Sequence, residues 1–368
     1  GLMTAIDATV VCKPFSGVHY AVSNQVQAML ARYGDQAPMC FAGDCDLAGA
    51  LTRYPGVGAH VDNSLTAAGR RVFWQQYHLP KLLRRYHCDR LLAMAYTAPR
   101  RCTVPYAVQI HDVIALRRPE LCTARNAWHM RFLMPRSIRA AEWIITSSAP
   151  VADEIVSLTG VKRDRVHVVP LGVDTIFLQD TCPEPLQPEW QELEPYLLFV
   201  GNFEPKKGID KLLDAYEIVA ARTGLNLVLA GRNGWKCKNL TNRITRYAGP
   251  GKIIRLGYVE RRQLPALYEH ARLFVLPSVE EGFGLPVLEA MARGTVTIHS
   301  DHPVLQRTSN GFGVTFPVND AVALAQTIER TLNDPDKTAE FATAARDYAR
   351  AQTWDRWAIH TAEATGYF

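Results

Sequence analysis

The sequence lacks several features that mark other classes of protein. Its apolar runs all stay shorter than about eighteen residues, so no segment is expected to cross a membrane as a helix. Its eight cysteines are scattered without a Cys-x-x-Cys pair, which in a chain of this length argues against a disulfide framework and a zinc site. Asp7 interrupts the apolar start of the chain, so no signal peptide is predicted there. We therefore expect a protein of the reducing cytoplasm.

The composition is that of a globular protein. The chain has 368 residues, of which 48% are hydrophobic and 21% are charged. These proportions allow a sizeable core and exclude disordered, collagenous and coiled-coil classes. No internal repeat and no low-complexity tract is present, and the length predicts about two domains.

Positive charge is concentrated in one part of the chain. Residues 1–180 carry 20 Lys and Arg against 14 Asp and Glu, whereas residues 181–368 carry 21 against 22. Within residues 81–139 the count is 12 against 3. Such a segment is either a solvated basic surface or one that attracts a phosphate-bearing acceptor or an anionic lipid surface. Composition alone leaves these alternatives open.

The first half of the chain alternates short strand patterns with amphipathic helix patterns. Strands are predicted over Ala8–Cys12, Pro38–Ala42, Arg90–Met94, Tyr106–His111, Trp143–Ser147 and Val166–Pro170. Helices are predicted over Ser23–Tyr33, Ala127–Ala141 and Val151–Leu158. A stretch rich in Pro and Glu, residues 181–195, then predicts a linker.

The same alternation restarts after the linker. Strands are predicted over Tyr196–Val200, Leu225–Ala230, Lys252–Leu256, Leu273–Leu276, Thr295–Ile298 and Gly313–Phe316. Helices are predicted over Ile209–Ala221, Leu264–Ala271, Pro286–Arg293, Ala321–Leu332 and Thr338–Ala351. Because alternating strands and helices form parallel sheets with right-handed crossovers, the sequence predicts an α/β protein of two Rossmann-like domains. The cleft between two such domains is the expected ligand site.

The segment from Leu276 to Gly294 is the most informative one. It runs Leu-Pro-Ser-Val-Glu-Glu-Gly-Phe-Gly-Leu-Pro-Val-Leu-Glu-Ala-Met-Ala-Arg-Gly. A strand is expected to end at Pro277, a glycine loop follows, and Pro286 suits the first position of a helix. The first amides of that helix would point unpaired at the space before it, which favours an anion there. These amides are those of Leu285, Val287 and Leu288.

Two carboxylates flank this anion site, Glu281 before the glycines and Glu289 in the first helical turn. A ligand that is only an anion does not explain them, whereas a nucleotide sugar does. Its diphosphate would take the helix amides, and the carboxylates would accept hydrogen bonds from ribose and hexose hydroxyls. The alternative, an acidic turn that complements the helix dipole, accounts for Glu289 but not for Glu281.

The pattern Glu281-x7-Glu289, within Glu-Gly-Phe-Gly-Leu-Pro-x-Leu-Glu-Ala, resembles the signature of glycosyltransferase family 4. Members of that family are retaining, metal-independent enzymes of the GT-B fold, in which two parallel sheets face each other across a cleft. The resemblance implies that Glu281 holds hydroxyls of the donor sugar and Glu289 the ribose. The implied backbone contacts are those of Phe283 and Gly284 to the sugar, and those of Leu285, Pro286 and Val287 to the phosphates. It implies no metal and no cofactor beside the co-substrate, either GDP-mannose or a UDP-hexose.

The loop Gly-Asn-Phe-Glu-Pro-Lys-Lys-Gly after Val200 is similar to a second segment of the family. A lysine of that segment grips the donor diphosphate, which by position is Lys207, with Lys206 beside it. An ammonium at the carboxyl end of a strand is well placed to neutralise charge on a departing nucleotide. Many members place an arginine where Asn202 stands here, and Arg232, after the next strand, is the candidate that supplies the missing charge.

Two segments of the first half resemble the same family. Phe15-Ser-Gly-Val-His-Tyr20 is similar to its glycine loop, through which Gly17 lets the donor phosphates approach; an ordinary strand–helix turn is the alternative. Val108-Gln-Ile-His-Asp112 resembles its His-Asp pair, in which the histidine, here His111, reaches the donor sugar near the reacting carbon.

The resemblance also implies a division of labour along the chain. Residues 1–180 would bind the acceptor, residues 196–350 would bind the nucleotide sugar, and residues 351–368 would form a helix that returns to the first domain. The Gly-Val-Asp at residues 172–174 is assigned a hinge role.

Two features depart from the family pattern or compete with it. Asp44-Cys-Asp46 has the Asp-x-Asp form by which metal-dependent glycosyltransferases hold a divalent ion, but its position is more typical of a solvated loop, and we reject a metal site there. Relatives show Pro-Glu where this chain has Asp301-His-Pro. The missing acid bears on donor or acceptor preference, but not on the reaction class.

The sequence therefore predicts a retaining hexosyltransferase that moves a hexose, with mannose favoured, from a nucleoside diphosphate sugar to an acceptor hydroxyl. The predicted catalytic residues are His111, Lys207 and Glu281. The expected partners are the donor and a glycan or lipid-diphosphate-linked acceptor, with no nucleic acid; contact with an anionic membrane at the inner face stays an open alternative. The first rival is an epimerase or phosphorylase of the same fold, and the second is a non-catalytic sugar- or nucleic-acid-binding protein.

Overall fold

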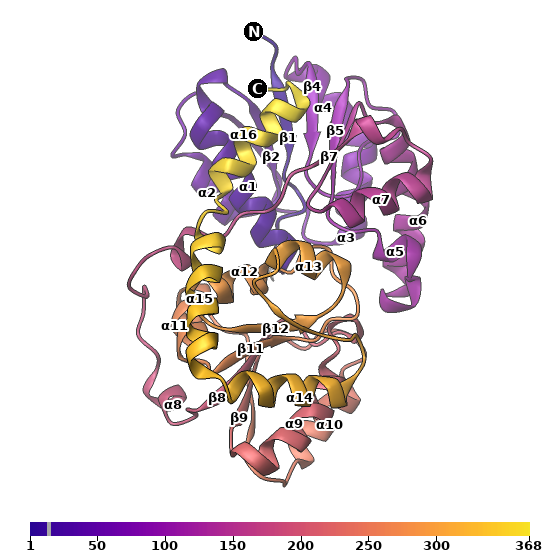
Figure 1. Cartoon of the computed structure of the whole chain (residues 1–368). Helices are drawn as coiled ribbons and strands as arrows, with labels where there is room; N and C mark the ends of the chain where they lie inside the picture. The colour runs from indigo at the N-terminus through magenta and orange to yellow at the C-terminus, as the bar shows by residue number, and fades with distance from the viewer. Residues whose placement is uncertain (13–15) are drawn as a thin grey trace. The chain divides into compact units, whose positions relative to one another are not determined.

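The chain folds into two compact units (Figure 1). The structure is a computed structural model that describes residues 1–12 and 16–368, apart from the side chains of Cys45 and Ala68. Unit 1 comprises Gly1–Gly172 and Thr353–Phe368, and unit 2 comprises Val173–Gln352.

The boundary between the units lies after Gly172, not after residue 180. The expected linker, residues 181–195, belongs to unit 2 and contains a short helix, α8 (Pro188–Gln191). Its proline and glutamate content predicted a linker between the domains. Instead, the carbonyls of Phe177 and Gln179 just before it accept hydrogen bonds from Arg293, a side chain of unit 2.

Unit 1 contains a seven-stranded parallel sheet in the order β3-β2-β1-β4-β5-β6-β7 (Figure 1). Its strands are β1 (Thr4–Asp7), β2 (Met39–Ala42), β3 (Gly58–Val61), β4 (Arg90–Ala93), β5 (Tyr106–Ile110), β6 (Trp143–Thr146) and β7 (Val166–Val168). Every neighbouring pair is parallel, which confirms the predicted sheet type. The central strands β1 and β5 are buried along their whole length, as is usual where helices cover both faces of a sheet.

Two strands of unit 1 differ from the prediction. β1 ends at Asp7 and not in the expected Ala8–Cys12, because the chain turns there: Asp7 Oδ1 accepts hydrogen bonds from the Thr9 amide at 3.1 Å and the Thr9 hydroxyl at 2.6 Å. β3 had no apolar run to indicate it, because it is an edge strand whose residues are only half-buried or exposed.

The helices of unit 1 are α1 (Gly17–Tyr33), α2 (Cys45–Leu51), α3 (Ala68–Phe73), α4 (Leu79–Arg85), α5 (Ile114–Arg117), α6 (Ala124–Ala140), α7 (Ala149–Thr159) and α16 (Trp354–Thr365). Shorter turns are η1 (Gly34–Gln36), the π-helical η2 (Trp74–His78), η3 (Pro119–Leu121) and η4 (Arg163–Arg165). The final helix α16 packs on α1, where Arg32 forms a 2.8 Å ion pair with Asp355. Residues 353–368 thus complete the unit in which the chain began.

Unit 2 contains a six-stranded parallel sheet in the order β10-β9-β8-β11-β12-β13. Its strands are β8 (Tyr196–Val200), β9 (Asn226–Ala230), β10 (Ile253–Gly257), β11 (Leu273–Leu276), β12 (Thr297–Ser300) and β13 (Val314–Phe316). β8 and β11 have the predicted bounds. β12 starts later than predicted because Thr295 still belongs to the preceding turn, with its amide bonded to the Ala290 carbonyl and its hydroxyl to the Tyr268 carbonyl.

The helices of unit 2, besides α8, are α9 (Ile209–Thr223), α10 (Lys238–Arg246), α11 (Leu264–His270), α12 (Leu285–Ala292), α13 (Pro303–Ser309), α14 (Ala321–Leu332) and α15 (Pro335–Arg350). Its short turns are η5 (Thr175–Phe177), η6 (Pro205–Lys207) and η7 (Arg261–Gln263). α10 was not predicted, because Ile244 is its single buried residue. Within the described residues, none of the helices is long and apolar enough to cross a bilayer.

Candidate active site

Glu281 and Lys207 form an ion pair beyond the carboxyl ends of β8 and β11. Lys207 Nζ donates to Glu281 Oε1 at 2.5 Å, and Ser278 Oγ donates to the same oxygen at 2.7 Å. Burial by itself would raise the pKa of Glu281, but Lys207, Lys206 and the two hydrogen bonds lower it below its usual value. Glu281 is therefore a buried carboxylate at neutral pH, able to accept hydrogen bonds from hydroxyl groups.

Backbone contacts hold together the two loops that carry this ion pair. The carbonyl oxygen of Lys206 accepts hydrogen bonds from the amides of Val279 and Glu280, at 2.8 and 3.3 Å. Gly208 has a φ of 68°, and a side chain there would overlap the carbonyl of Pro277, so only glycine fits. The fold itself thus sets the contact between the ammonium and the carboxylate.

Helix α12 begins directly after the glycine loop, with Gly284 as its N-cap at a φ of 87°. The sequence predicted unpaired amides at Leu285, Val287 and Leu288. This prediction is wrong for Val287, whose amide donates to the Gly284 carbonyl at 3.0 Å. Pro286 has no amide hydrogen to offer. The amides of Phe283, Gly284 and Leu285 are left as the candidates that meet an anion at this helix start.

The second carboxylate of the motif, Glu289, is buried in α12 and paired with an arginine. Arg261 Nη1 donates to Glu289 Oε2 at 3.0 Å, and Arg261 Nη2 lies 3.5 Å from Asp174 Oδ2. Burial is the main influence on Glu289 and raises its pKa; Arg261 opposes this rise and Asp174 adds to it. Arg261, which no sequence motif indicated, thus connects Glu289 to the segment expected to act as a hinge.

Asn202 and Arg232 meet beyond the ends of β8 and β9. Asn202 Oδ1 accepts a hydrogen bond from the Arg232 amide at 3.3 Å. The Arg232 guanidinium lies over the Tyr258 ring, 4.1 Å from its centroid, and its Nη1 is buried without a hydrogen-bond partner among the described residues. Because an unpaired buried donor is costly, Arg232 is suited to receive a phosphate oxygen, whereas the Asn202 side chain positions the Arg232 backbone.

Glu280, the residue before Glu281, forms a buried pair with His302. No sequence pattern indicated this pair. His302 Nε2 is 3.1 Å from Glu280 Oε2. Since His302 Nδ1 accepts the Val304 amide at 3.2 Å and caps α13, the ring proton is on Nε2 and points to the carboxylate. The pair forms only because the parallel alignment of β11 and β12 brings together two loops far apart in sequence.

His111 follows β5 in unit 1, whereas Glu281 lies in unit 2. Its Nε2 lies 3.0 Å from the Met94 carbonyl and 3.1 Å from the Gln109 amide nitrogen. Because the two hydrogens of that amide already go to Gln25 Oε1 and to the Met94 carbonyl, the ring proton is on Nε2 and Nδ1 is the acceptor. Burial lowers the pKa of His111, so the ring is neutral at neutral pH. Asp112 accepts a hydrogen bond from the Tyr96 hydroxyl at 2.8 Å, which holds the Tyr96 ring against the histidine.

Gly17 is the first residue of α1, with Ser16 as the N-cap. The predicted glycine loop starts at Phe15, which is outside the described residues. A Cβ at Gly17 would meet no described atom within 4 Å. Packing against the described residues of unit 1 therefore does not demand glycine here.

Comparison with known proteins relates both units to one class of enzyme. The family model "Glycosyltransferase Family 4" matches residues 15–177, and "Glycosyl transferases group 1" matches residues 184–348. O-antigen chain mannosyltransferase B of Escherichia coli is 33% identical to this chain, over 69% of this chain and 68% of its own length. The chain belongs to the family 4 glycosyltransferases.

One more sequence relative and one solved structure are similar to this glycosyltransferase, the first in sequence and the second in fold. O-antigen chain mannosyltransferase RfbU of Salmonella typhimurium is 26% identical over 64% of this chain and 63% of its own length. HepE of Anabaena, solved in complex with UDP and glucose, superposes with a TM-score of 0.74 at 16% identity and covers 100% of both chains. The predicted GT-B fold is confirmed.

The Asp-x-Asp motif of the glycosyltransferase has a structural role. Asp44 is the N-cap of α2, and its Oδ1 accepts the amides of Asp46 at 2.9 Å and Leu47 at 3.1 Å. Asp46 is exposed in the first turn, where a carboxylate complements the helix dipole. Helix capping thus accounts for this pair of acids.

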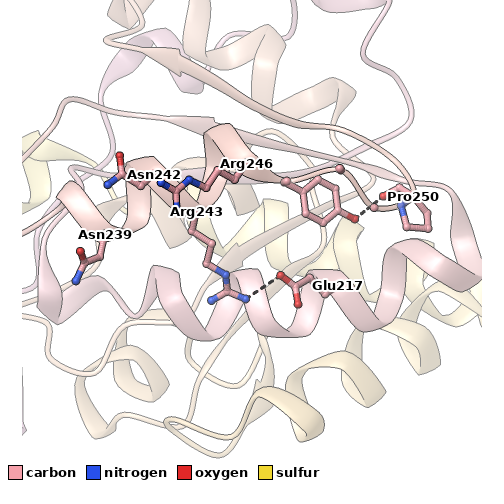
Figure 2. Close-up of a pocket in the computed structure, with 9 residues that line it drawn as sticks. Glu217, Asn239, Asn242, Arg243, Arg246 and Pro250 are labelled. Carbon is pink, nitrogen blue, oxygen red and sulfur yellow. Dashed lines mark hydrogen bonds and ion pairs between the residues drawn. The ribbon is translucent and has the colours of Figure 1, made fainter.

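A groove of about 740 Å³ between α9 and α10 contains none of the predicted site residues (Figure 2). Its Arg243 is already paired, with Asp214 at 2.7 Å and Glu217 at 3.0 Å. Tyr247 donates its hydroxyl hydrogen to the Pro250 carbonyl at 2.6 Å. We therefore assign no donor contact of the glycosyltransferase to this groove.

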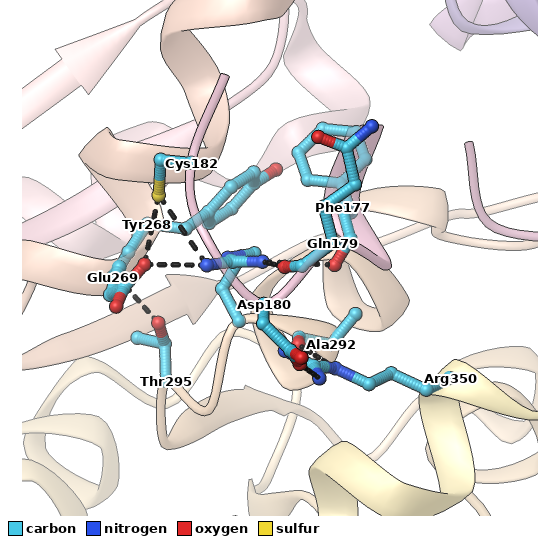
Figure 3. Close-up of polar contacts among 10 residues, drawn as sticks. Phe177, Gln179, Asp180, Cys182, Tyr268, Glu269, Ala292, Thr295 and Arg350 are labelled. Atoms are coloured by element: carbon cyan, nitrogen blue, oxygen red, sulfur yellow. Dashed lines mark hydrogen bonds and ion pairs between the residues drawn. The ribbon is translucent and has the colours of Figure 1, made fainter. Parts of the chain in front are cut away.

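The segment after the unit boundary, with Phe177, Gln179 and Cys182, lies against Glu269 of the same unit (Figure 3) and is held there by Arg293. Its guanidinium donates to the carbonyls of Phe177 and Gln179 and, at 2.7 Å, to Glu269 Oε2. The Cys182 thiol donates to the same carboxylate at 2.9 Å, and burial together with Glu269 raises the pKa of this thiol to about 11. These contacts explain why the segment belongs to unit 2, and they indicate a protonated thiol with a structural role.

The family resemblance implies that Glu289 binds the ribose of the donor, and from this role the contact between Arg261 and Glu289 predicts an effect on nucleotide binding. We expect Arg261→Ala to weaken the binding of a nucleoside diphosphate by about tenfold, because the buried carboxylate loses a charge-assisted hydrogen bond. The pKa of Glu289 would rise further without Arg261, so the loss should grow as the pH falls. Calorimetric titration with GDP and UDP at neutral and mildly acidic pH measures both effects.

Arg262→Ala is the matched control, because this neighbouring arginine is 64% exposed and pairs with Glu184 away from Glu289. Equal affinities of the two variants at both pH values would contradict the role given to Arg261.

Proposed function

We propose that this glycosyltransferase is retaining and moves a hexose, with mannose favoured, from a nucleoside diphosphate sugar to a hydroxyl of a glycan acceptor. GDP-mannose is the favoured donor, and a lipid-linked or polysaccharide-precursor glycan the favoured acceptor. The observation that carries the proposal is the ion pair between Lys207 and the buried Glu281, close in the chain to the start of α12. In this pair a cation suited to a diphosphate lies next to a carboxylate suited to sugar hydroxyls. The names of the two mannosyltransferase relatives support the choice of sugar.

In the proposed reaction the bond between the anomeric carbon and the diphosphate oxygen breaks, and a bond to the acceptor oxygen forms on the same face. The acceptor proton passes to the leaving phosphate. Negative charge grows on the diphosphate as it departs, and Lys207, Arg232 and the amides at the start of α12 would stabilise it. No metal and no further cofactor is part of the proposal.

Glu281 and His111 have different proposed tasks. The Glu281 carboxylate, kept charged by Lys207, would hold the hexose hydroxyls and fix the sugar for attack. His111 offers a neutral imidazole with an acceptor Nδ1, suited to a sugar hydroxyl near the reacting carbon. Glu289 would bind the ribose, and no side chain is assigned as a nucleophile.

The proposal is tested by incubating the purified chain with GDP-mannose, UDP-glucose or UDP-mannose and a glycan acceptor. Nuclear magnetic resonance of the product gives the sugar transferred and its anomeric configuration. We expect transfer of mannose with retention and an unchanged rate in EDTA. An inverted product, a strict requirement for a divalent metal, or an epimer or sugar phosphate in place of a transfer product would contradict it.

A further inference from the structure

Four aromatic side chains protrude from unit 1 on two helical segments. Phe73 of α3 and Tyr77 of η2 are 57% and 63% exposed, and Trp128 and Phe132 of α6 are 76% and 44% exposed. Across residues 1–12 and 16–368, Tyr258 is the one other aromatic side chain with comparable exposure. Large exposed rings gathered in one place mark a surface that meets something other than water.

The two segments border a common groove of about 420 Å³, and both can be found on the same unit in Figure 1. The groove is lined by three of the four rings and by two exposed arginines, and the fourth ring, Phe73, lies 4.8 Å from Tyr77. We call this surface the aromatic–arginine face. It comprises Phe73, Tyr77, Arg100, Arg101, Trp128 and Phe132.

The stretch of chain that carries these rings is strongly basic. Residues 68–139 carry 14 Lys and Arg against 3 Asp and Glu. The three acids are engaged elsewhere, Asp89 with the Met3 amide, Asp112 with Tyr96 and Glu120 with Arg118. On α6 the spacing of Arg125, Trp128, Phe132 and Arg136 puts cations and rings on one side of the helix. The Arg136 and Arg100 guanidinium groups lie 3.8 and 5.6 Å from the Phe132 ring centroid.

We infer that the aromatic–arginine face docks this glycosyltransferase onto an anionic membrane surface. Aromatic rings prefer the interfacial layer of a bilayer, and arginines are attracted by anionic headgroups there. Composition left two alternatives for the basic stretch, a solvated surface or one that attracts an anionic partner. The structure adds protruding aromatic rings next to arginines of this stretch, and a solvated surface does not explain those rings. The inference goes beyond the transfer reaction, and its test needs neither donor nor acceptor.

The experiment is flotation of the purified chain with vesicles of phosphatidylcholine, with and without phosphatidylglycerol. Each arginine near an anionic surface contributes about fivefold in affinity, so we expect binding at least about tenfold tighter to the anionic vesicles, and weaker in high salt. The double variant Arg100→Glu, Arg101→Glu should lose at least about tenfold in binding to anionic vesicles. The double variant Trp128→Ala, Phe132→Ala should also bind less tightly, because the rings contribute buried apolar area.

Arg84→Glu, Arg85→Glu is the matched control, because these adjacent arginines are also exposed in unit 1 but lie on α4, outside the face. This control changes the net charge by the same amount as the variant at Arg100 and Arg101, and it should keep most of the binding to anionic vesicles. Thermal melting checks that each variant is folded, and if the aromatic variant melts early, the charge variant still decides the question.

Several outcomes would overturn the inference. The wild-type chain could bind both vesicle types equally well, or the variants at Arg100 and Arg101 and at Arg84 and Arg85 could lose the same amount of vesicle binding. Alternatively, the variants of the face could lose binding to a soluble oligosaccharide while their vesicle binding stays unchanged. Concentration-dependent dimers that disappear in the aromatic variant would also overturn it, since the face would then be a contact between two copies of the chain.

Discussion

Replacing Lys207 by alanine is expected to lower the rate of sugar transfer by about 10²–10³-fold, the scale for removing one preorganised charge from a transition state. The ammonium stands at the carboxyl edge of the sheet, next to the helix start where the diphosphate is proposed to bind. Its loss also removes the main influence that keeps the pKa of Glu281 low against burial. We therefore expect the remaining activity to fall as the medium becomes mildly acidic, more steeply than in the wild type. Transfer rates over a pH series measure both effects.

Lys211→Ala is the control for this experiment. Lys211 lies on α9 of the same unit and forms a long 3.9 Å ion pair with Asp214 at the surface. It should change the transfer rate by less than about twofold. If Lys207→Ala behaved like Lys211→Ala, the proposed diphosphate site would be wrong.

Glu281→Ala is expected to abolish transfer, because the donor sugar loses the carboxylate that positions it, while Lys207 and Ser278 lose their shared acceptor. Glu281→Gln separates charge from shape, since it keeps the size of the side chain but not the negative charge. We expect it to lose most of the activity as well, with nucleoside diphosphate binding largely kept. Transfer assays and calorimetry with the nucleotide alone distinguish these effects.

The low pKa of Glu281 also predicts a pH-dependent part of the stability. A carboxyl whose folded pKa lies below its usual value of 4.5 stabilises the fold above the unfolded pKa, and this contribution is lost as the pH falls through the folded pKa. The difference in Tm between the wild type and Glu281→Gln should therefore be largest near neutral pH and should shrink below about pH 4.5. Glu329→Gln, which breaks an ion pair with Arg222 on the surface, is the matched control and should show little dependence. A Tm difference for Glu281→Gln that grows toward acid would contradict the assigned ion pair.

Strand and helix positions in unit 2 were largely predictable, because its strands are short apolar runs between clear turn residues. The predicted bounds of β8, β11 and α14 agree with the structure. Elements with few buried residues were missed, such as the edge strand β3 and the polar helix α10, because their sequences carry little apolar periodicity. The shift of β1 has another cause, since Asp7 and Thr9 form a local turn that ends the strand within an apolar run.

The sequence by itself determined the two-domain α/β architecture, the family and the Glu281–Glu289 motif, because each depends on residues that are near one another in the chain. Only the tertiary structure decided the partners of these residues. Arg261 meets Glu289, and His302 meets Glu280, through contacts between loops far apart in sequence. The exposed rings of η2 and α6 likewise line one groove. Parallel strands bring distant loops to one edge of a sheet, and side-chain packing then selects which residues touch. No local pattern of residue types records that choice.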